Sequence, residues 1–168
     1  MNIKKVLVIG SCGSGKSTLA KEISEKLNLP LIALDQYYWK PGWIRSEKEE
    51  WRNIVSGLIK KEEWVMDGNY QSTLDLRMPV SDLIVFLDVS RFVCLWRILK
   101  RRLLKNRVDK IDGCPERIDF KFIKWVLWEY PYRRRRVVLK LLEEYNDKEI
   151  FIFKNNRDRN DLFKILSV

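Results

Sequence analysis

Short apolar runs alternate with segments of helical periodicity along most of this chain. The runs lie at residues 3–9, 31–34, 64–66, 83–87 and 150–153. Continuous apolar runs of this length are typical of strands that are buried on both faces, as in a parallel sheet covered by helices. We therefore expect an α/β fold in which strands and helices alternate.

Three segments carry apolar residues at helical spacing. The first opens with a capping-box pattern at Ser46 and Glu49, and the second follows Ser90, a candidate N-cap. The third lies shortly before the last apolar run. The expected apolar stripes are Trp51, Ile54, Val55, Leu58 and Ile59; Leu95, Leu99 and Leu103; and Val137, Val138, Leu141, Leu142 and Tyr145. Each stripe predicts a helix that packs with one face inward.

The periodicity is interrupted in the region 105–135. Polar and turn-forming residues break it at Asn106, Asp109, Asp112, Gly113 and Pro115. We expect one domain over residues 1–168, with an insertion or lid around 105–135. Three aromatic residues follow helical spacing there and are expected to pack: Trp125, Trp128 and Tyr132.

Composition narrows the function classes. A chain of 168 residues fits one domain, and 33 Lys and Arg against 23 Asp and Glu give a net charge of +10. That excess indicates a polyanionic partner, either nucleotide phosphates or nucleic acid. No apolar run exceeds five residues, so no membrane span is expected.

Cysteine and histidine usage excludes several chemistries. The three cysteines (Cys12, Cys94 and Cys114) are widely spaced, and the chain contains no histidine. A zinc site would have too few soft ligands, and Ser-His or Cys-His catalysis is impossible. The first residues lead directly into a strand-like run without a signal-peptide pattern, so a reducing, cytoplasmic location is expected.

The strongest motif is Gly10-Ser11-Cys12-Gly13-Ser14-Gly15-Lys16-Ser17, which matches G-x-x-x-x-G-K-[ST]. A strand precedes it, and a helix begins after it at Thr18. Backbone amides of such a loop converge on phosphate oxygens, helped by the positive end of the following helix. The expected ATP-binding residues are Gly10, Ser11, Cys12, Gly13, Ser14, Gly15, Lys16, Ser17 and Thr18. Lys16 would bridge the β- and γ-phosphates and Ser17 would ligate Mg²⁺, while Cys12 is interpreted as a tolerated small residue.

A second magnesium ligand is expected at the end of a neighbouring strand. Asp67 and Asp88 both follow apolar runs, and ligands of open α/β sheets bind beyond the carboxyl ends of the strands. Asp67 is preferred, because Gly68 lets the chain turn sharply and leaves room for a substrate. Asp88 is equally well explained as a polar residue that ends a strand and caps toward Ser90.

Arginines flank the expected lid on both sides. Arg97 and Arg101 lie one helical turn apart before it, and the run Arg133–Arg136 follows it. Guanidinium groups that close over a transferring phosphoryl group stabilise its charge. For any single arginine of the run, a solvated basic face is the more common explanation.

The phosphate loop, Asp67-Gly68 and the pair Arg97-x-x-x-Arg101 resemble the adenylate kinase superfamily of P-loop kinases. The chain more closely resembles bacterial DNA topology modulation proteins, on motifs at 34–43, 64–70, 74–77 and 114–117. The resemblance implies a three-layer P-loop sandwich with five parallel strands in the order 2-3-1-4-5, a lid and an ATP site. It implies little about the substrate. The expected lid residues are Arg117, Arg133 and Arg134.

The acceptor side departs from adenylate kinases. Their Asp-Gly-Phe-Pro-Arg motif appears here as residues 67–71 without its phosphate-gripping arginine, and Arg77 is the candidate replacement. Asp35 ends the second strand, as in similar kinases that phosphorylate a hydroxyl group, where a carboxylate accepts the proton. A turn residue that caps the next segment is the alternative for Asp35. The expected substrate-binding residues are Asp35, Tyr37, Asp67, Asn69 and Arg77.

Aromatic residues gather in the loop after the second strand, at Tyr37, Tyr38, Trp39 and Trp43. They would either stack on a planar acceptor or form a satellite hydrophobic cluster, and the sequence does not separate these two.

Three functions compete. The favoured one is a kinase that transfers the γ-phosphate of Mg-ATP to a small nucleoside- or nucleotide-like acceptor, with Lys16, Asp35, Arg97 and Arg101 as catalytic residues. The alternative is a nucleotide-dependent DNA-binding regulator that affects DNA topology, although the chain carries no recognised nucleic-acid-binding motif. A bare ATPase or ATP sensor is the third, and it would leave the lid and Asp35 without a purpose.

Overall fold

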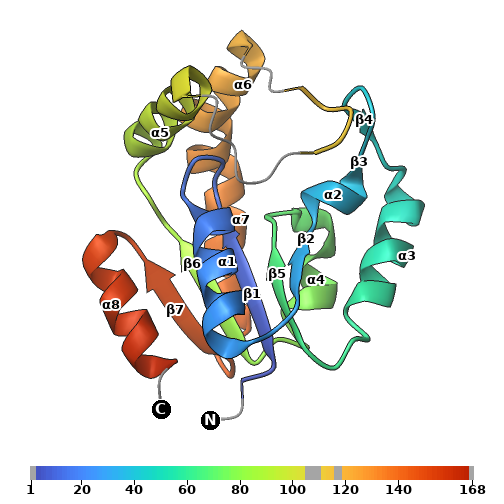
Figure 1. Cartoon of the computed structure of the whole chain (residues 1–168), viewed down its shortest axis with the longest axis vertical. Coiled ribbons are helices and arrows are strands. Elements are labelled where there is room, and N and C mark those ends of the chain that lie inside the picture. The colour runs from blue at the N-terminus through green and yellow to red at the C-terminus, as the bar shows by residue number, and fades with distance from the viewer. Residues whose placement is uncertain (1–2, 105–110, 116–118, 167–168) are drawn as a thin grey trace.

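The computed structural model of the protein describes residues 3–104, 111–115 and 119–166. Its centre is a five-stranded sheet in which every pairing is parallel (Figure 1). The strands are β1 (Lys5–Gly10), β2 (Leu31–Ala33), β5 (Trp64–Asp67), β6 (Leu83–Leu87) and β7 (Glu149–Phe153). Their order is β2-β5-β1-β6-β7, which places the five strands in the expected sequence 2-3-1-4-5. The predicted α/β class and the positions of all five strands are confirmed.

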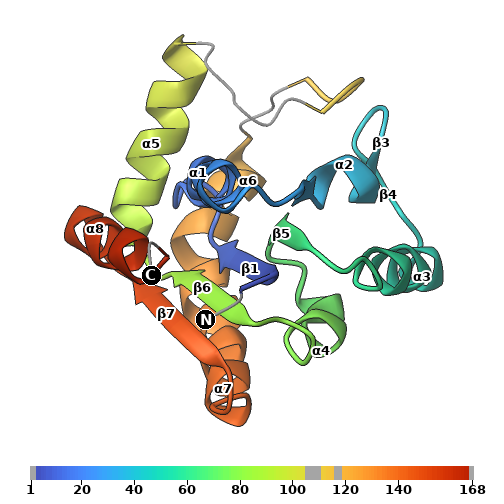
Figure 2. The same ribbon diagram turned by 60° about the horizontal axis from the view of Figure 1, so that its bottom comes forward.

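Helices cover both faces of the sheet. Alternate residues of β1 point to opposite sides, so Val6 and Val8 pack under one layer and Leu7 and Ile9 under the other. The first layer is α1 (Lys16–Leu27) with α8 (Asn156–Ile165). The second layer is α3 (Lys48–Leu58), α4 (Leu74–Arg77) and α7 (Arg135–Glu144). Figure 2 shows α1 and α7 on opposite sides of the strands, which is the three-layer arrangement that the sequence predicts.

The first helix cap lies one residue later than predicted. Helix α3 has a capping box formed by Glu47 and Glu50 instead of Ser46 and Glu49. The Ser46 hydroxyl instead donates a hydrogen bond of 2.9 Å to the carbonyl of Tyr38. The cap prediction is wrong because Ser46 is needed to close the preceding loop.

The predicted apolar stripe of the second helix is only partly right. Helix α5 (Arg91–Leu104) begins after Ser90 and buries Cys94 and Ile98, with Leu95 packed beside them, whereas Leu99 is 43% exposed and Leu103 83% exposed. The buried face of α5 packs across the phosphate loop and the later helix η2 (Trp125–Arg134). In α7, Val138 is buried as predicted, while Val137 is exposed.

Several short elements were not predicted. They are α2 (Asp35–Tyr38), the two-stranded ribbon of β3 (Trp39–Lys40) and β4 (Ile44–Arg45), and the 3-10 turn η1 (Gln71–Thr73). Elements of two to four residues carry no periodicity that a sequence pattern can reveal. All of them lie beside the carboxyl ends of β2 and β5, where they shape the candidate site.

The region expected to form a lid is only partly described. Residues 120–134 are helical, as α6 (Phe120–Lys124) and the π-helix η2, which continues into α7. The lid prediction for Arg117 lies outside the described residues. Trp125 packs face to face with Phe122, as expected, but Trp128 is 55% exposed and Tyr132 is also exposed, so their packing prediction is wrong. The Tyr132 hydroxyl accepts a hydrogen bond of 3.1 Å from the Arg91 guanidinium, at the start of α5.

Within the described ranges, no helix combines the length and the apolar character that crossing a membrane requires.

Candidate active site at the carboxyl ends of the strands

The carboxyl ends of four neighbouring strands bring the candidate residues together. The phosphate loop follows β1, Asp35 follows β2, Asp67 ends β5 and Asp88 follows β6. Strand pairing places Asp67 beside Val8 of β1 and beside Ala33 of β2. Because the strands are parallel, the segments that follow them meet at one edge of the sheet.

The phosphate loop has the backbone that its glycines predict. Gly13 has a φ of 75°, and a Cβ there would lie 2.4 Å from the carbonyl oxygen of Cys94. Gly15, with a φ of 96°, directly precedes α1. Only glycine adopts such angles readily, and they turn the backbone amides of the loop toward one point above the helix N-terminus. The hydroxyl groups of Ser11 and Ser14 are buried without a hydrogen-bond partner in the described part of the chain. The loop therefore fits a bound phosphate chain.

Lys16 and Asp67 face each other across the β1–β5 boundary. The Lys16 Nζ atom lies 3.7 Å from the Asp67 Oδ1 atom, and both side chains are largely shielded from solvent. Ser17 lies in the first turn of α1 and is half-buried. A hydroxyl and a carboxylate are oxygen ligands that suit Mg²⁺, whose other ligands are usually phosphates and water. Ser17 and Asp67 would hold such an ion.

Asp88 is engaged elsewhere. Its two carboxylate oxygens accept hydrogen bonds of 2.6 Å and 2.7 Å from the Arg135 guanidinium. This fork-shaped pair raises the pKa of Arg135, because the carboxylate stabilises the charged guanidinium. The sequence leaves two roles open for Asp88, a magnesium ligand or a strand-end cap toward Ser90, and its observed partner is Arg135. Of the two aspartates, Asp67 remains the better candidate for magnesium.

Helix α5 carries Arg97 to the phosphate loop. The Arg97 Nη1 atom donates a hydrogen bond of 2.7 Å to the carbonyl of Ser14. The neighbouring side chain of Ile98 lies under Gly13 and fixes the helix against the loop. Arg101 lies one turn further along α5 and is half-buried. A guanidinium is therefore positioned beside the loop that is expected to hold the γ-phosphate.

The arginine run at the end of η2 is divided among different partners. Arg134 donates to the Gln71 side chain at 2.9 Å, and Gln71 donates back to the Arg134 carbonyl at 2.6 Å. Arg135 binds Asp88, while Arg133 and Arg136 are exposed. The contact with Gln71 places the end of η2 beside the loop that follows β5.

Asp35 lies beside the same loop. The Tyr70 hydroxyl donates a hydrogen bond of 2.5 Å to the Asp35 Oδ1 atom, and the Leu34 amide donates to the carbonyl of Asp67 at 2.9 Å. Burial, together with the charge of Asp35, raises the pKa of Tyr70. The Oδ1 atom of Asn69 is buried and has no hydrogen-bond partner in the described part of the chain. Asp35 thus contacts the loop after β5 through Tyr70, and its side chain does not cap the short helix that it begins.

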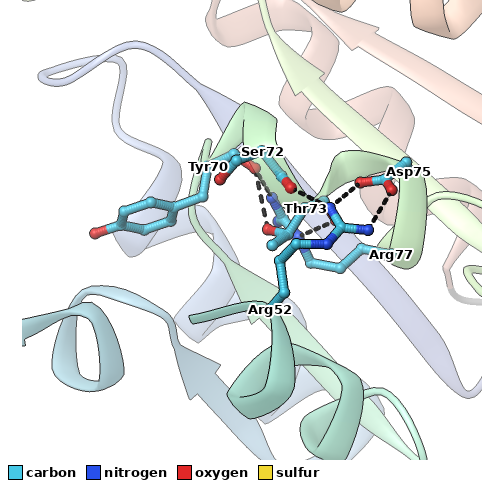
Figure 3. Close-up of polar contacts among 6 residues, drawn as sticks. All are labelled: Arg52, Tyr70, Ser72, Thr73, Asp75 and Arg77. Atoms are coloured by element: carbon cyan, nitrogen blue, oxygen red, sulfur yellow. Dashed lines mark hydrogen bonds and ion pairs between the residues drawn. The ribbon is translucent and has the colours of Figure 1, made fainter. Parts of the chain in front are cut away.

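Arg77 does not reach a substrate, which corrects the sequence prediction. Its side chain is 0% exposed and donates to the carbonyls of Thr73, Gly68 and Tyr70 at 3.2, 2.8 and 2.6 Å. Burial lowers the pKa of Arg77 to about 9. Figure 3 shows Arg77 beneath the loop, with Arg52 approaching the same loop from α3. Arg77 holds the loop after β5 in shape, and each of its three guanidinium nitrogens donates to a carbonyl of that loop.

The aromatic residues after β2 were expected either to stack on an acceptor or to form a hydrophobic cluster, and the structure gives them different surroundings. Tyr38 packs against Trp51 and Tyr70, at ring-centroid distances of 5.0 Å and 4.5 Å, and belongs to a hydrophobic cluster. Tyr37 is 41% exposed and remains available to a ligand. Trp43 donates from its indole nitrogen to the carbonyl of Pro115 at 2.9 Å.

Residues 111–115 therefore lie against the β3–β4 ribbon. The Gly42 amide donates to the carbonyl of Gly113 at 2.8 Å, and the Cys114 thiol lies 3.3 Å from the carbonyl of Lys40. Figure 1 shows this segment beside β3 and β4.

Sequence reasoning missed Tyr70 as a site residue. Its one signal was its place within the motif at 64–70, two residues after Gly68. An aromatic residue in that position has no distinctive chemistry until a partner from another strand is known.

Comparison with known proteins shows which fold this chain shares. No protein-family model matches the chain. A shikimate kinase from Sulfurihydrogenibium sp. (strain YO3AOP1) is 27% identical over 128 residues, covering 65% of this chain and 76% of that protein. The solved shikimate kinase from Aquifex aeolicus vf5 has a TM-score of 0.57 at 20% identity, covering 96% of each chain. Deoxyadenosine kinase from M. mycoides has a TM-score of 0.51 at 16% identity, covering 98% of this chain and 100% of that one. The chain thus has the α/β fold of the P-loop kinases.

Proposed function

We propose that this protein is a kinase that transfers the γ-phosphate of Mg-ATP to a hydroxyl group of a small, nucleoside-like acceptor. One observation carries the proposal: a phosphate loop and a carboxylate suited to be a base follow strands β1 and β2, which both flank β5. The Lys16–Asp67 pair lies on the boundary between them. Names of similar proteins, shikimate kinase and deoxyadenosine kinase, agree with a small-molecule acceptor.

The nucleotide side would work by electrostatic stabilisation. The amides from Gly13 to Ser17 would bind the β- and γ-phosphates, and Lys16 would leave Asp67 to bridge them. Arg97, held at the Ser14 carbonyl, would face the charge that develops on the transferring group. Mg²⁺ bound by Ser17 and Asp67 would neutralise phosphate charge.

The acceptor side would work by orientation and proton removal. Asp35 would accept the proton of the acceptor hydroxyl as its oxygen forms a bond to the γ-phosphorus. The bond from that phosphorus to the bridging oxygen breaks, and ADP leaves with the electron pair. The transferred proton remains on Asp35 until water takes it.

The position of Arg77 favours a hydroxyl acceptor over a nucleoside monophosphate. A monophosphate acceptor needs cations on its own phosphate, and Arg77 was the sequence-based candidate for that contact. Arg77 is fully buried, and each of its three guanidinium nitrogens donates to a carbonyl of the loop. Two further arginines contact this loop, and both have partners: Arg52 is held by Asp75 at 2.7 Å, and Arg134 donates to the Gln71 side chain at 2.9 Å. A neutral acceptor with hydroxyl groups matches the carboxylate of Asp35 and the carbonyl oxygen of Asn69.

The test is a panel assay of acceptor-dependent ADP release from Mg-ATP. The panel contains deoxyadenosine, deoxycytidine, shikimate, AMP and dCMP. We expect turnover with a member that carries no phosphate group (deoxyadenosine, deoxycytidine or shikimate), and loss of that turnover in Lys16→Ala. The matched control is Lys21→Ala, an exposed lysine of the same helix that pairs with Glu25. The proposal fails if the folded protein does not bind Mg-ATP in calorimetry, or if no member of the panel stimulates ADP release.

A further inference from the structure

The hydrogen bond between Tyr70 and Asp35 joins loops from two neighbouring strands. Tyr70 lies three residues after the end of β5, and Asp35 lies two residues after the end of β2. The Tyr70 hydroxyl donates to one oxygen of Asp35, Oδ1, at 2.5 Å. A donor fixed to one carboxylate oxygen limits the rotation of the carboxylate and leaves the second oxygen, Oδ2, to accept another hydrogen bond. No residue in the described ranges donates to Oδ2.

Both the ring and the backbone of Tyr70 are held in place. Its ring packs against Tyr38 and Trp51, at centroid distances of 4.5 Å and 4.8 Å, and Trp51 is fully buried in the core. Its backbone carbonyl accepts a hydrogen bond of 2.6 Å from the Arg77 guanidinium. A side chain with a packed ring and an anchored backbone has few rotamers left, so it is a rigid support for its partner.

The phenol stays protonated under all working conditions. Burial and the adjacent negative charge of Asp35 raise the pKa of Tyr70 above that of a free tyrosine. Tyr70 is therefore a permanent donor and not itself a base. A permanent donor stabilises the ionised form of the carboxylate that it contacts.

We propose that Tyr70 is the positioning residue of Asp35, fixing the carboxylate so that Oδ2 faces the acceptor hydroxyl. This inference rests on the proposed function, because it assigns Tyr70 to the base of that reaction. Tyr70 touches neither phosphate nor acceptor, and it acts only through Asp35.

The test compares Tyr70→Phe with Tyr38→Phe and Asp35→Asn. Both phenylalanine variants keep an aromatic ring in the same cluster, but only Tyr70→Phe removes the hydroxyl that contacts Asp35. The substrate is the member of the panel above with the highest acceptor-dependent rate. The readouts are kcat, the KM for Mg-ATP and the thermal stability of each variant.

We expect Tyr70→Phe to lower kcat by about 10- to 100-fold, because the base is misplaced, while the KM for Mg-ATP is unchanged. Tyr38→Phe behaves like the wild type. A purely structural loss would lower thermal stability and would change kcat and the KM for Mg-ATP together.

The outcomes separate this inference from the proposed function. If Asp35→Asn abolishes transfer but Tyr70→Phe matches Tyr38→Phe, the positioning assignment is overturned and the kinase proposal stands. If Asp35→Asn keeps full activity, Asp35 is not the base and both assignments to this carboxylate fall. If no panel member stimulates turnover, the kinase proposal fails and the inference fails with it.

Discussion

The assignment of Arg77 as a loop support leads to a sharp mutational prediction. Arg77→Lys keeps the positive charge but replaces a planar group with five N–H donors by a single ammonium. The native guanidinium makes three hydrogen bonds to backbone carbonyls from a fully buried position. A lysine at this site reaches one of those carbonyls at most, so two hydrogen bonds from a charged donor are lost.

The magnitude follows from those two bonds. A hydrogen bond from a charged group contributes about 1.5–3 kcal/mol, so the expected loss in unfolding free energy is about 3–6 kcal/mol. The burial cost of a cation is retained, because lysine is also charged. For a chain of this size, each kcal/mol lowers Tm by roughly 2–4 °C, which gives a decrease of about 6–24 °C.

The assay is urea and thermal unfolding followed by circular dichroism. The matched control is Arg52→Lys, drawn beside Arg77 in Figure 3. Arg52 binds Asp75 and the Ser72 carbonyl from a partly exposed position, so its replacement is expected to lower stability far less than Arg77→Lys does. Our reasoning is refuted if Arg77→Lys unfolds like the wild type and instead raises the KM of an acceptor, since that result would make Arg77 a substrate ligand.

Three further predictions concern the surrounding contacts. Gly13→Ala forces a Cβ within 2.4 Å of the Cys94 carbonyl oxygen at a φ of 75°, so we expect the affinity for Mg-ATP in calorimetry to fall by at least about tenfold. The control is Gly57→Ala in α3, where a Cβ meets open space, and it is expected to stabilise the fold by about 0.5–1 kcal/mol. Equal effects of the two substitutions would contradict the geometry. Arg135→Lys breaks the fork with Asp88 and is expected to cost about 1–2 kcal/mol in unfolding while Mg-ATP affinity is unchanged; a loss of magnesium dependence would return Asp88 to the metal site. Trp43→Phe removes the indole donor to the Pro115 carbonyl, so amide hydrogen exchange at 111–115 should accelerate, and an unchanged rate would show that this contact does not hold the segment.

Much of the fold was predictable because it depends on local pattern. Five apolar runs gave the five strands, since a strand buried on both faces must be apolar throughout. Their lateral order came from a family resemblance and not from the runs themselves. The helix stripes were less secure, and α5 shows why: its apolar positions do not say whether the sheet or the phosphate loop will cover them. Cys94 and Ile98 face inward only because Gly13 has no side chain in the way.

The candidate site was also only partly predictable from the sequence. A contiguous motif, such as Gly10–Ser17, is recognisable because its function lies in the local backbone geometry. Residues that act in pairs are not recognisable, because their partners are distant in the sequence. Arg77 and Tyr70 illustrate this limit. The sequence favoured Arg77 as a substrate ligand and gave no reason to assign a role to Tyr70.

The sequence by itself determined the alternation of strands and helices, the phosphate loop, and the edge of the sheet at which the carboxylates of Asp35, Asp67 and Asp88 lie. These features depend on the identity of neighbouring residues and on the direction of parallel strands. Only the tertiary structure decided that Asp88 binds Arg135, that Arg77 is buried beneath the loop and that Tyr70 meets Asp35. Each of those contacts joins residues from different elements of the chain, and the free energy of burying a charge or a phenol depends on partners that only folding brings within reach.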